Sequence, residues 1–145
     1  MIEVAITIGI GLLGGIAVGT QAPIAGAMAQ RVGGVASSFV VHLGGLLASL
    51  VLLLIRRGEQ IALWRELPWY MLCCGGFGLV LYLSISHTLP RLGAVSALSL
   101  IIVGQLLAGV VIDYLGAFGT IPRGLGANRV LGVALLFVGA FLVVR

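Results

Sequence analysis

The side chains able to do chemistry in this sequence are few, and they lie inside long apolar runs. Gln105, Gly109 and Asp113 recur every four residues, which places them on one face of a helix over residues 93–115. Asp113 is the only acidic residue inside such a run, and an ionisable group in an apolar environment marks a functional site by default. We predict a coupling or gating role for Asp113. Because it lies near the end of its run, contact with water or with an arginine such as Arg123 is the structural alternative.

A second polar group lies in the run 4–29. Thr20 and Gln21 precede Pro23, which lacks an N–H and leaves the carbonyl of Gly19 without its helical donor. The resulting kink with polar side chains is typical of transporter binding sites, where irregular backbone lines a cavity. A glutamine that only hydrogen-bonds to a neighbouring helix is the alternative interpretation.

Other polar side chains occur singly within the runs. The imidazole of His42 can exchange protons near neutral pH, and local hydrogen bonding is the alternative role for a lone histidine. Serines in helices bond to carbonyls one turn back, so a serine such as Ser99 also has a structural alternative. The substrate-binding residues that we predict are Gln21, Gln105, Thr20, Ser99 and His42.

Three glycines form a stripe along the first run. Gly11, Gly15 and Gly19 recur every four residues and so share one helical face. In lipid no hydrophobic effect holds helices together, so close contact across small residues does much of that work. We predict a helix-packing role for these glycines, with a substrate-facing groove as the alternative.

The composition requires lipid as the solvent for most of the chain. The 145 residues are 61% hydrophobic and 8% charged, with a mean hydropathy of +1.26, which leaves too little polar surface to cover a soluble globule. Lipid cannot satisfy free backbone groups, so the runs must be helices. At roughly 20 apolar residues per crossing, the chain has room for about five transmembrane helices in a single domain, residues 1–145. We expect these helices at about 4–29, 34–55, 68–86, 93–115 and 125–144.

Several function classes are disfavoured by what the sequence lacks. It has no HExxH, Walker, GxSxG or haem-attachment motif, and no paired carboxylates within its runs. Cys73 and Cys74 are adjacent but have no further ligands for a metal site. The arginines do not form the clustered surface that nucleic-acid binding needs. We therefore expect no enzyme activity, no metal, no cofactor and no nucleic-acid partner, and any transport must run on a gradient or on the membrane potential.

The arginines are nearly balanced between the two sides of the predicted bundle. The side of the amino terminus holds Arg56, Arg57, Arg65, Arg123 and Arg129, and the opposite side holds Arg31, Arg91 and Arg145. Because orientation follows such differences, the small excess favours an amino terminus in the cytoplasm but leaves insertion in both orientations possible.

The segment Leu92–Gly119, LGAVSALSLIIVGQLLAGVVIDYLGAFG, resembles the YdcZ-like family of small bacterial inner-membrane proteins. The family pattern of an LGAA-type turn, an apolar run, a GQL-type step and an acidic residue before the helix end is met by Leu92, Gly93, Ala94, Gly104, Gln105, Leu106 and Asp113. The resemblance covers nearly the whole chain, and its other points are Gln21, Pro68, Trp69, Arg129 and Gly132.

This family is similar to the drug/metabolite transporter superfamily, whose larger members have ten helices in two inverted five-helix halves. The resemblance implies that the chain is one such half, completed as an antiparallel homodimer or as a heterodimer with a homologous chain, with the solute site at the midplane. The implied function is secondary transport of a small-molecule solute across the bacterial inner membrane. A non-transporting membrane scaffold or accessory subunit is the alternative.

Two departures from related proteins bear on the solute. Ala25 stands where family members often have an asparagine, so a fixed polar pair with Gln21 is missing. Small multidrug exporters of the same superfamily exchange protons at a glutamate in the middle of the first helix, whereas Glu3 lies close to the terminus here. Neutral or anionic solutes, and coupling through Asp113 or His42, remain open.

Overall fold

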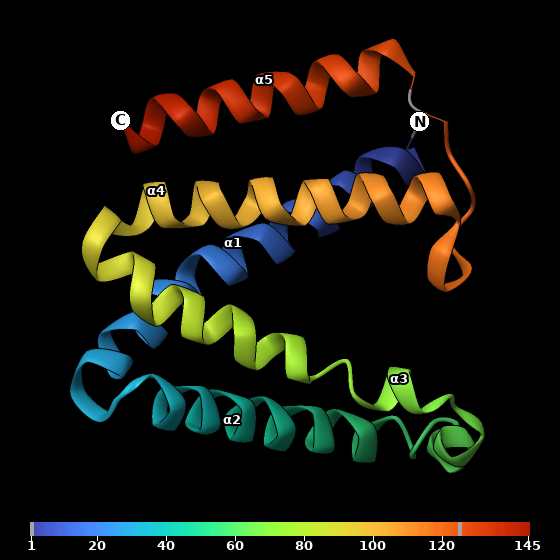
Figure 1. Ribbon diagram of the computed structural model, residues 1–145. Helices are drawn as coiled ribbons and strands as arrows, with labels where there is room; N and C mark the ends of the chain where they lie inside the picture. The colour runs from blue at the N-terminus through green and yellow to red at the C-terminus, as the bar shows by residue number, and fades with distance from the viewer. Residues whose placement is uncertain (1, 125) are drawn as a thin grey trace. The chain divides into compact units, whose positions relative to one another are not determined.

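The computed structural model describes residues 2–124 and 126–145, and every regular element in these ranges is helical (Figure 1). In chain order the elements are α1 (Ile2–Val32), α2 (Gly34–Ile55), the 3-10 helix η1 (Ile61–Glu66), α3 (Trp69–Leu72), α4 (Gly76–Leu115), the 3-10 helix η2 (Ala117–Gly119) and α5 (Ala127–Val144). The chain divides into two compact units, Met1–His87 and Thr88–Arg145, and the boundary falls within α4.

Four helical segments of the described residues are long and apolar enough to cross a bilayer, namely α1, α2, the stretch Trp69–Leu115 and α5. The third segment has 47 residues. As one straight helix it would extend about 70 Å, more than twice the roughly 30 Å of hydrocarbon in a bilayer. It is broken at Gly93, where φ is 76° and ψ is 169°. Two crossings fit within this segment, so the structure is compatible with the five crossings predicted above.

The predicted helices 4–29 and 34–55 correspond to α1 and α2. The predicted helix 125–144 corresponds to α5, although its expected first residue, Leu125, lies outside the described residues. The largest difference concerns the helices predicted at 68–86 and 93–115. A turn after Leu72 separates α3 from α4, and α4 then continues through the segment where the sequence predicts a turn.

The break in α4 falls at a glycine and not at the nearby proline. Residues 87–91, which include Pro90, are helical. Proline removes one backbone donor, but its restricted φ is compatible with a helix. A positive φ is readily accessible to glycine and strained for other residues. The chain therefore leaves the helical conformation at Gly93, three residues after the proline.

α1 and α2 form a helical hairpin whose joint is a single residue, Gly33, with φ 89°. The half of α1 next to this joint has a buried face of small residues at helical spacing, Ala22, Ala25, Gly26 and Ala29. The hydroxyl of Ser37 on α2 donates a hydrogen bond to the carbonyl of Ala25 at 2.9 Å. Small side chains allow two helix backbones to approach closely, and a direct hydrogen bond then joins them.

Most large apolar side chains point away from the protein. The buried apolar residues of the described chain are almost all alanines: Ala22, Ala25, Ala29, Ile85, Ala97 and Ala140. By contrast Leu12, Leu46 and Leu135 on three different helices are each more than 60% exposed. Exposed apolar surface of this extent suits lipid as the surrounding solvent. The guanidinium of Arg65 lies 5.7 Å from the ring centre of Trp64, a pairing typical of the headgroup zone between two spans.

Candidate functional site

The second unit is an antiparallel pair formed by α5 and the part of α4 that follows Gly93 (Figure 1). The hydroxyl of Ser96, early in α4, donates to the carbonyl of Val143, late in α5, at 3.1 Å. At the opposite end, Asp113 of α4 forms an ion pair with Arg129 of α5. Early residues of one helix thus meet late residues of the other at both ends, which fixes the antiparallel arrangement.

A groove runs between these helices and collects the polar stripe predicted from the sequence. Gln105, Gly109 and Asp113 line it from α4, and Arg129 and Gly132 line it from α5. Apolar side chains complete the lining: Leu106, Val110, Val133 and Leu136. The groove has a volume of about 340 Å³. A Cβ atom added at Gly109 or Gly132 would meet nothing within 4 Å, so both glycines leave open space beside the polar groups.

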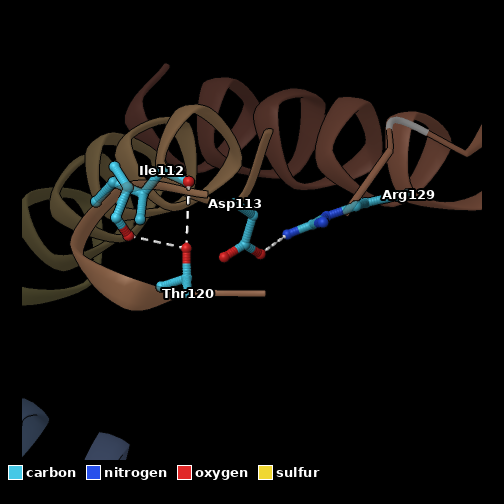
Figure 2. Close-up of polar contacts among 5 residues, drawn as sticks. Ile112, Asp113, Thr120 and Arg129 are labelled. Atoms are coloured by element: carbon cyan, nitrogen blue, oxygen red, sulfur yellow. Dashed lines mark hydrogen bonds and ion pairs between the residues drawn. The ribbon is translucent and has the colours of Figure 1, made fainter. Parts of the chain in front are cut away.

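The ion pair at one end of the groove is its strongest polar feature. Figure 2 shows the guanidinium of Arg129 directed at the carboxylate of Asp113 across the space between the two helices. The Asp113 side chain is 29% exposed and that of Arg129 is 32% exposed. Arg123, the partner suggested from the sequence, is not the one observed. Its backbone N–H instead donates to the carbonyl of Asp113 at 2.9 Å.

Neither charge of this pair suits its own helix. Asp113 lies in the last turn of α4, and Arg129 lies in the first turn of α5. A helix dipole favours cations at the carboxy-terminal end and anions at the amino-terminal end, so both side chains oppose the dipole of their helix. The attraction between the two side chains offsets this penalty. The pair is therefore not explained as helix capping.

The loop after α4 brings the two charges together. Gly116 adopts a left-handed conformation, with φ 61°, and terminates the helix. The hydroxyl of Thr120 donates to the carbonyl of Ala117 at 2.9 Å and also contacts that of Ile112 at 3.4 Å (Figure 2). The N–H of Arg123 and the Thr120 contact to Ile112 thus meet carbonyls in the last turn of α4, where helical donors run out. The loop is thus folded against the helix end, and α5 starts beside it.

The other predicted binding residues lie in separate grooves. Thr20 and Gln21 line a wide groove of about 560 Å³ together with Ala17, Ile24, Ala25 and Val41. The Thr20 hydroxyl donates to the carbonyl of Ile16 at 2.8 Å, within its own helix. Gln21 is exposed and has no hydrogen bond within the described residues. The helix α1 continues through Pro23, so the expected kink does not interrupt it.

Ser99 and His42 do not join the groove of Gln105 and Asp113. Ser99 lines a smaller groove of about 260 Å³ between α4 and α5, with Leu135 and Gly139 opposite. His42 lies in the first unit, where its ring meets that of Tyr82 in an edge-on contact with 5.3 Å between centres. The substrate-binding role of all five residues stays a prediction, and Gln21 and Gln105 belong to different units.

The predicted packing glycines have open space around them within the chain. A Cβ at Gly11, Gly15 or Gly19 would meet nothing within 4 Å. Close approach occurs instead at Gly34, where a Cβ would lie 2.7 Å from Oγ of Ser86. The first unit therefore places no helix on the stripe, and its packing role stays a prediction.

Sequence reasoning from spacing alone did not identify Arg129 as a site residue. Spacing along one helix relates Gln105 to Asp113, but it cannot relate either residue to a different helix. The family resemblance contained the missing information, because Arg129 and Gly132 are among the residues that carry it. Both line the groove.

Comparison with known protein families identifies the family of this chain. A family model described as "Putative inner membrane exporter, YdcZ" matches residues 6–142. The chain belongs to the YdcZ family. The match covers most of both units, and with the apolar helices it supports a multi-pass protein of the inner membrane. Searches of curated proteins and of solved structures found no significant match.

Proposed function

We propose that this YdcZ-family chain is one subunit of a secondary exporter, not driven by ATP, that moves a small neutral or anionic solute across the inner membrane. The active assembly is an antiparallel pair, formed with a second copy or with a homologous chain. The family description as an exporter supports the direction of movement. The groove between α4 and α5 supports the location of the solute site.

The observation that carries the proposal is the set of polar groups facing that groove. Gln105 is exposed and has no hydrogen-bond partner within the described residues. An amide left unpaired in hydrocarbon is unfavourable by several kcal/mol, so a membrane protein retains one only where water, a solute or another chain meets it. The same argument applies to the neighbouring ion pair, because charged side chains at membrane depth are unfavourable unless polar groups or water meet them.

The groove has the donors that an anionic or neutral polar solute needs. A guanidinium carries five N–H donors, and one carboxylate does not use them all. Asp113 can therefore hold Arg129 in place while the remaining donors stay available to the solute. Gln105 lies two helical turns away on the same face of α4, and its amide can donate to or accept from the far end of the solute. Gly109, between them, leaves the space.

The assembly with a second chain is supported by faces that this chain leaves open. Gln21 and the glycine stripe on α1 have no cover within the first unit. Helices in lipid associate through small residues and through interhelical hydrogen bonds. A partner helix that packs on the stripe would cover both features at once.

Flux measurements on charge variants test the proposal. Purified protein in liposomes is assayed with a panel of carboxylates, phosphates and neutral polar metabolites, and the double variant Asp113→Arg with Arg129→Asp is compared with it. The swap keeps an ion pair and places each charge at the helix end that its dipole favours, so we expect an unchanged or higher melting temperature. We expect flux to fall at least tenfold, because the carboxylate and the guanidinium have exchanged positions.

The specific observation in favour of a scaffold is that the ion pair ties α4 to α5. If the charge-swapped protein transports as well as the natural one, the ion pair only holds α4 against α5 and the proposed solute site is wrong. If the natural protein moves none of the panel, the scaffold interpretation replaces the exporter.

A further inference from the structure

His42 of α2 lies against the first part of α4, residues 76–87, within the first unit. Nδ1 of His42 lies 2.7 Å from the carbonyl oxygen of Ser38, one turn back on α2. A carbonyl can only accept a hydrogen bond, so Nδ1 carries the proton in the neutral ring. The lone pair is therefore on Nε2.

That lone pair faces a notch in α4. A Cβ atom at Gly78 would lie 2.5 Å from Nε2 of His42, so the imidazole fits only because residue 78 has no side chain. Tyr82, one turn further along α4, meets the ring at 5.3 Å between centres and 69° between planes. His42 is classed as exposed, so the imidazole is not enclosed by the described residues. Its printed hydrogen bonds within these residues involve Nδ1, which leaves Nε2 with its lone pair.

The surroundings of His42 contain no compensating charge. Among the described residues no carboxylate forms an ion pair with the imidazole. The groups that face it are the hydroxyl of Ser38 on α2, 3.2 Å from Nδ1, and Tyr82 on α4. Tyr82 is the one titratable group among these contacts.

The depth of His42 distinguishes it from the other ionisable residues. It lies near the middle of α2, a helix of 22 residues. The other acidic and basic side chains in the long helices lie toward a helix end or near the break in α4: Glu3, Arg31, His87, Arg91, Asp113 and Arg129. An ionisable group at mid-span is rare and is retained for a function, and histidine changes its charge in the physiological pH range.

We propose that His42 is a proton-binding site in the middle of the membrane, with Nε2 as the atom that takes the proton. A proton delivered by water at one face converts the neutral imidazole to imidazolium, and its return to water at the other face restores the neutral ring. No other bond is made or broken. While Nε2 lies against Gly78, its new N–H has no acceptor, so protonation favours a wider separation of α2 and α4 at the notch. The use of this proton to drive export depends on the function proposed above, whereas proton binding itself does not.

Nitrogen NMR of the purified protein in bilayers tests the site directly. Histidine labelled with ¹⁵N is observed while the pH is lowered from about 8 to about 5, the range in which histidine charge changes operate. His42→Asn assigns the resonances, since His87 is the only other histidine. We expect the Nε2 resonance of His42 to move from the position of a lone-pair nitrogen to that of an N–H. A lone-pair resonance throughout the range overturns the proposal.

Two glycine variants test the role of the notch. Gly78→Ala adds a methyl group where Nε2 lies, whereas Gly44→Ala on α2 adds one where nothing lies within 4 Å. We expect the midpoint of the His42 titration to move by at least half a pH unit in Gly78→Ala and to stay unchanged in Gly44→Ala. Equal midpoints in the two variants would show that the notch does not control the proton.

Flux under an imposed pH gradient separates this inference from the proposed function. Acceleration by the gradient in the natural protein, lost in His42→Asn, supports coupling at His42. Flux that ignores the gradient removes the coupling role and leaves the exporter intact. An absence of all flux, with normal titration of His42, removes the exporter and leaves the proton site.

Discussion

Asp113 and Arg129 show how two unfavourable placements can stabilise each other. Each side chain opposes the dipole of its own helix, and together they join α4 to α5 beside a groove. About a third of each side chain is exposed, which places the pair between a surface salt bridge and a buried one. The contribution of each side chain to the free energy of unfolding therefore depends on whether its partner is present.

Removal of one charge of the Asp113–Arg129 pair is predicted to lower the free energy of unfolding more than removal of both charges. Asp113→Asn leaves the guanidinium of Arg129 against the dipole and without its partner. We expect a loss of about 1–3 kcal/mol, between the values for exposed and buried pairs. The double variant Asp113→Asn with Arg129→Gln has no stranded charge and is expected to recover at least half of this loss. Unfolding in detergent, followed by circular dichroism, measures both. A double variant less stable than the single one would contradict the argument.

At the level of single residues, the sequence predicted which polar residues share a face of α4. It did not predict the ion-pair partner of Asp113, which depends on the path of a loop. The spacing of Gln105, Gly109 and Asp113 placed them on one face, and the structure has them in one groove. The partner of Asp113 depended on the path of residues 116–126, where Gly116 has a positive φ. No periodic pattern encodes such a path, so the nearer Arg123 was suggested in place of Arg129.

At the level of elements, length and hydropathy located the helices, and local backbone chemistry set their ends. α1, α2 and α5 follow the predicted runs, because an apolar run flanked by polar or glycine-rich links has few other conformations in lipid. The gap between the helices predicted at 68–86 and 93–115 contains Pro90 and is helical, and the break falls at Gly93. A proline and a glycine three residues apart both predict an interruption, and only the backbone conformation shows which one makes it.

Replacement of the glycine at the break is predicted to strain α4. Gly93 has φ 76°, a region that costs about 1–3 kcal/mol for a residue with a side chain. We expect Gly93→Ala to lower the free energy of unfolding by about that amount. Gly104→Ala is the matched control, because Gly104 lies within the helix and has open space around it. It should be neutral or stabilising by up to about 1 kcal/mol. Thermal unfolding of the two variants under identical conditions makes the comparison, and equal stability would show that Gly93 does not need its conformation.

At the level of the whole molecule, the outward-facing apolar residues suit a chain that is surrounded by lipid. The buried residues are small and few, and two glutamines lack partners within the described residues. The composition predicted lipid around the chain and the resemblance predicted a second chain. Sequence patterns such as the glycine stripe specify that a face is suited to packing, but they do not specify which helix covers it.

Orientation in the membrane is testable with single cysteines. Arg31 lies at the end of α1 and Arg57 follows α2, so the two positions mark opposite ends of the helical hairpin. After replacement of the exposed Cys73 and Cys74, a cysteine is introduced at one position at a time and labelled with an impermeant reagent in intact cells. We expect labelling at both positions, as an antiparallel homodimer requires. Labelling at only one position would rule out that dimer and direct the search to a partner chain or to a parallel arrangement.

The joint of one residue between α1 and α2 has a consequence for biosynthesis. Because Gly33 alone connects the two helices, we expect α1 and α2 to enter the membrane together as a hairpin. In the orientation that carries the tip across the membrane, the charged side chain next to the tip is Arg31. A single guanidinium is then the charge that crosses the hydrocarbon with the tip.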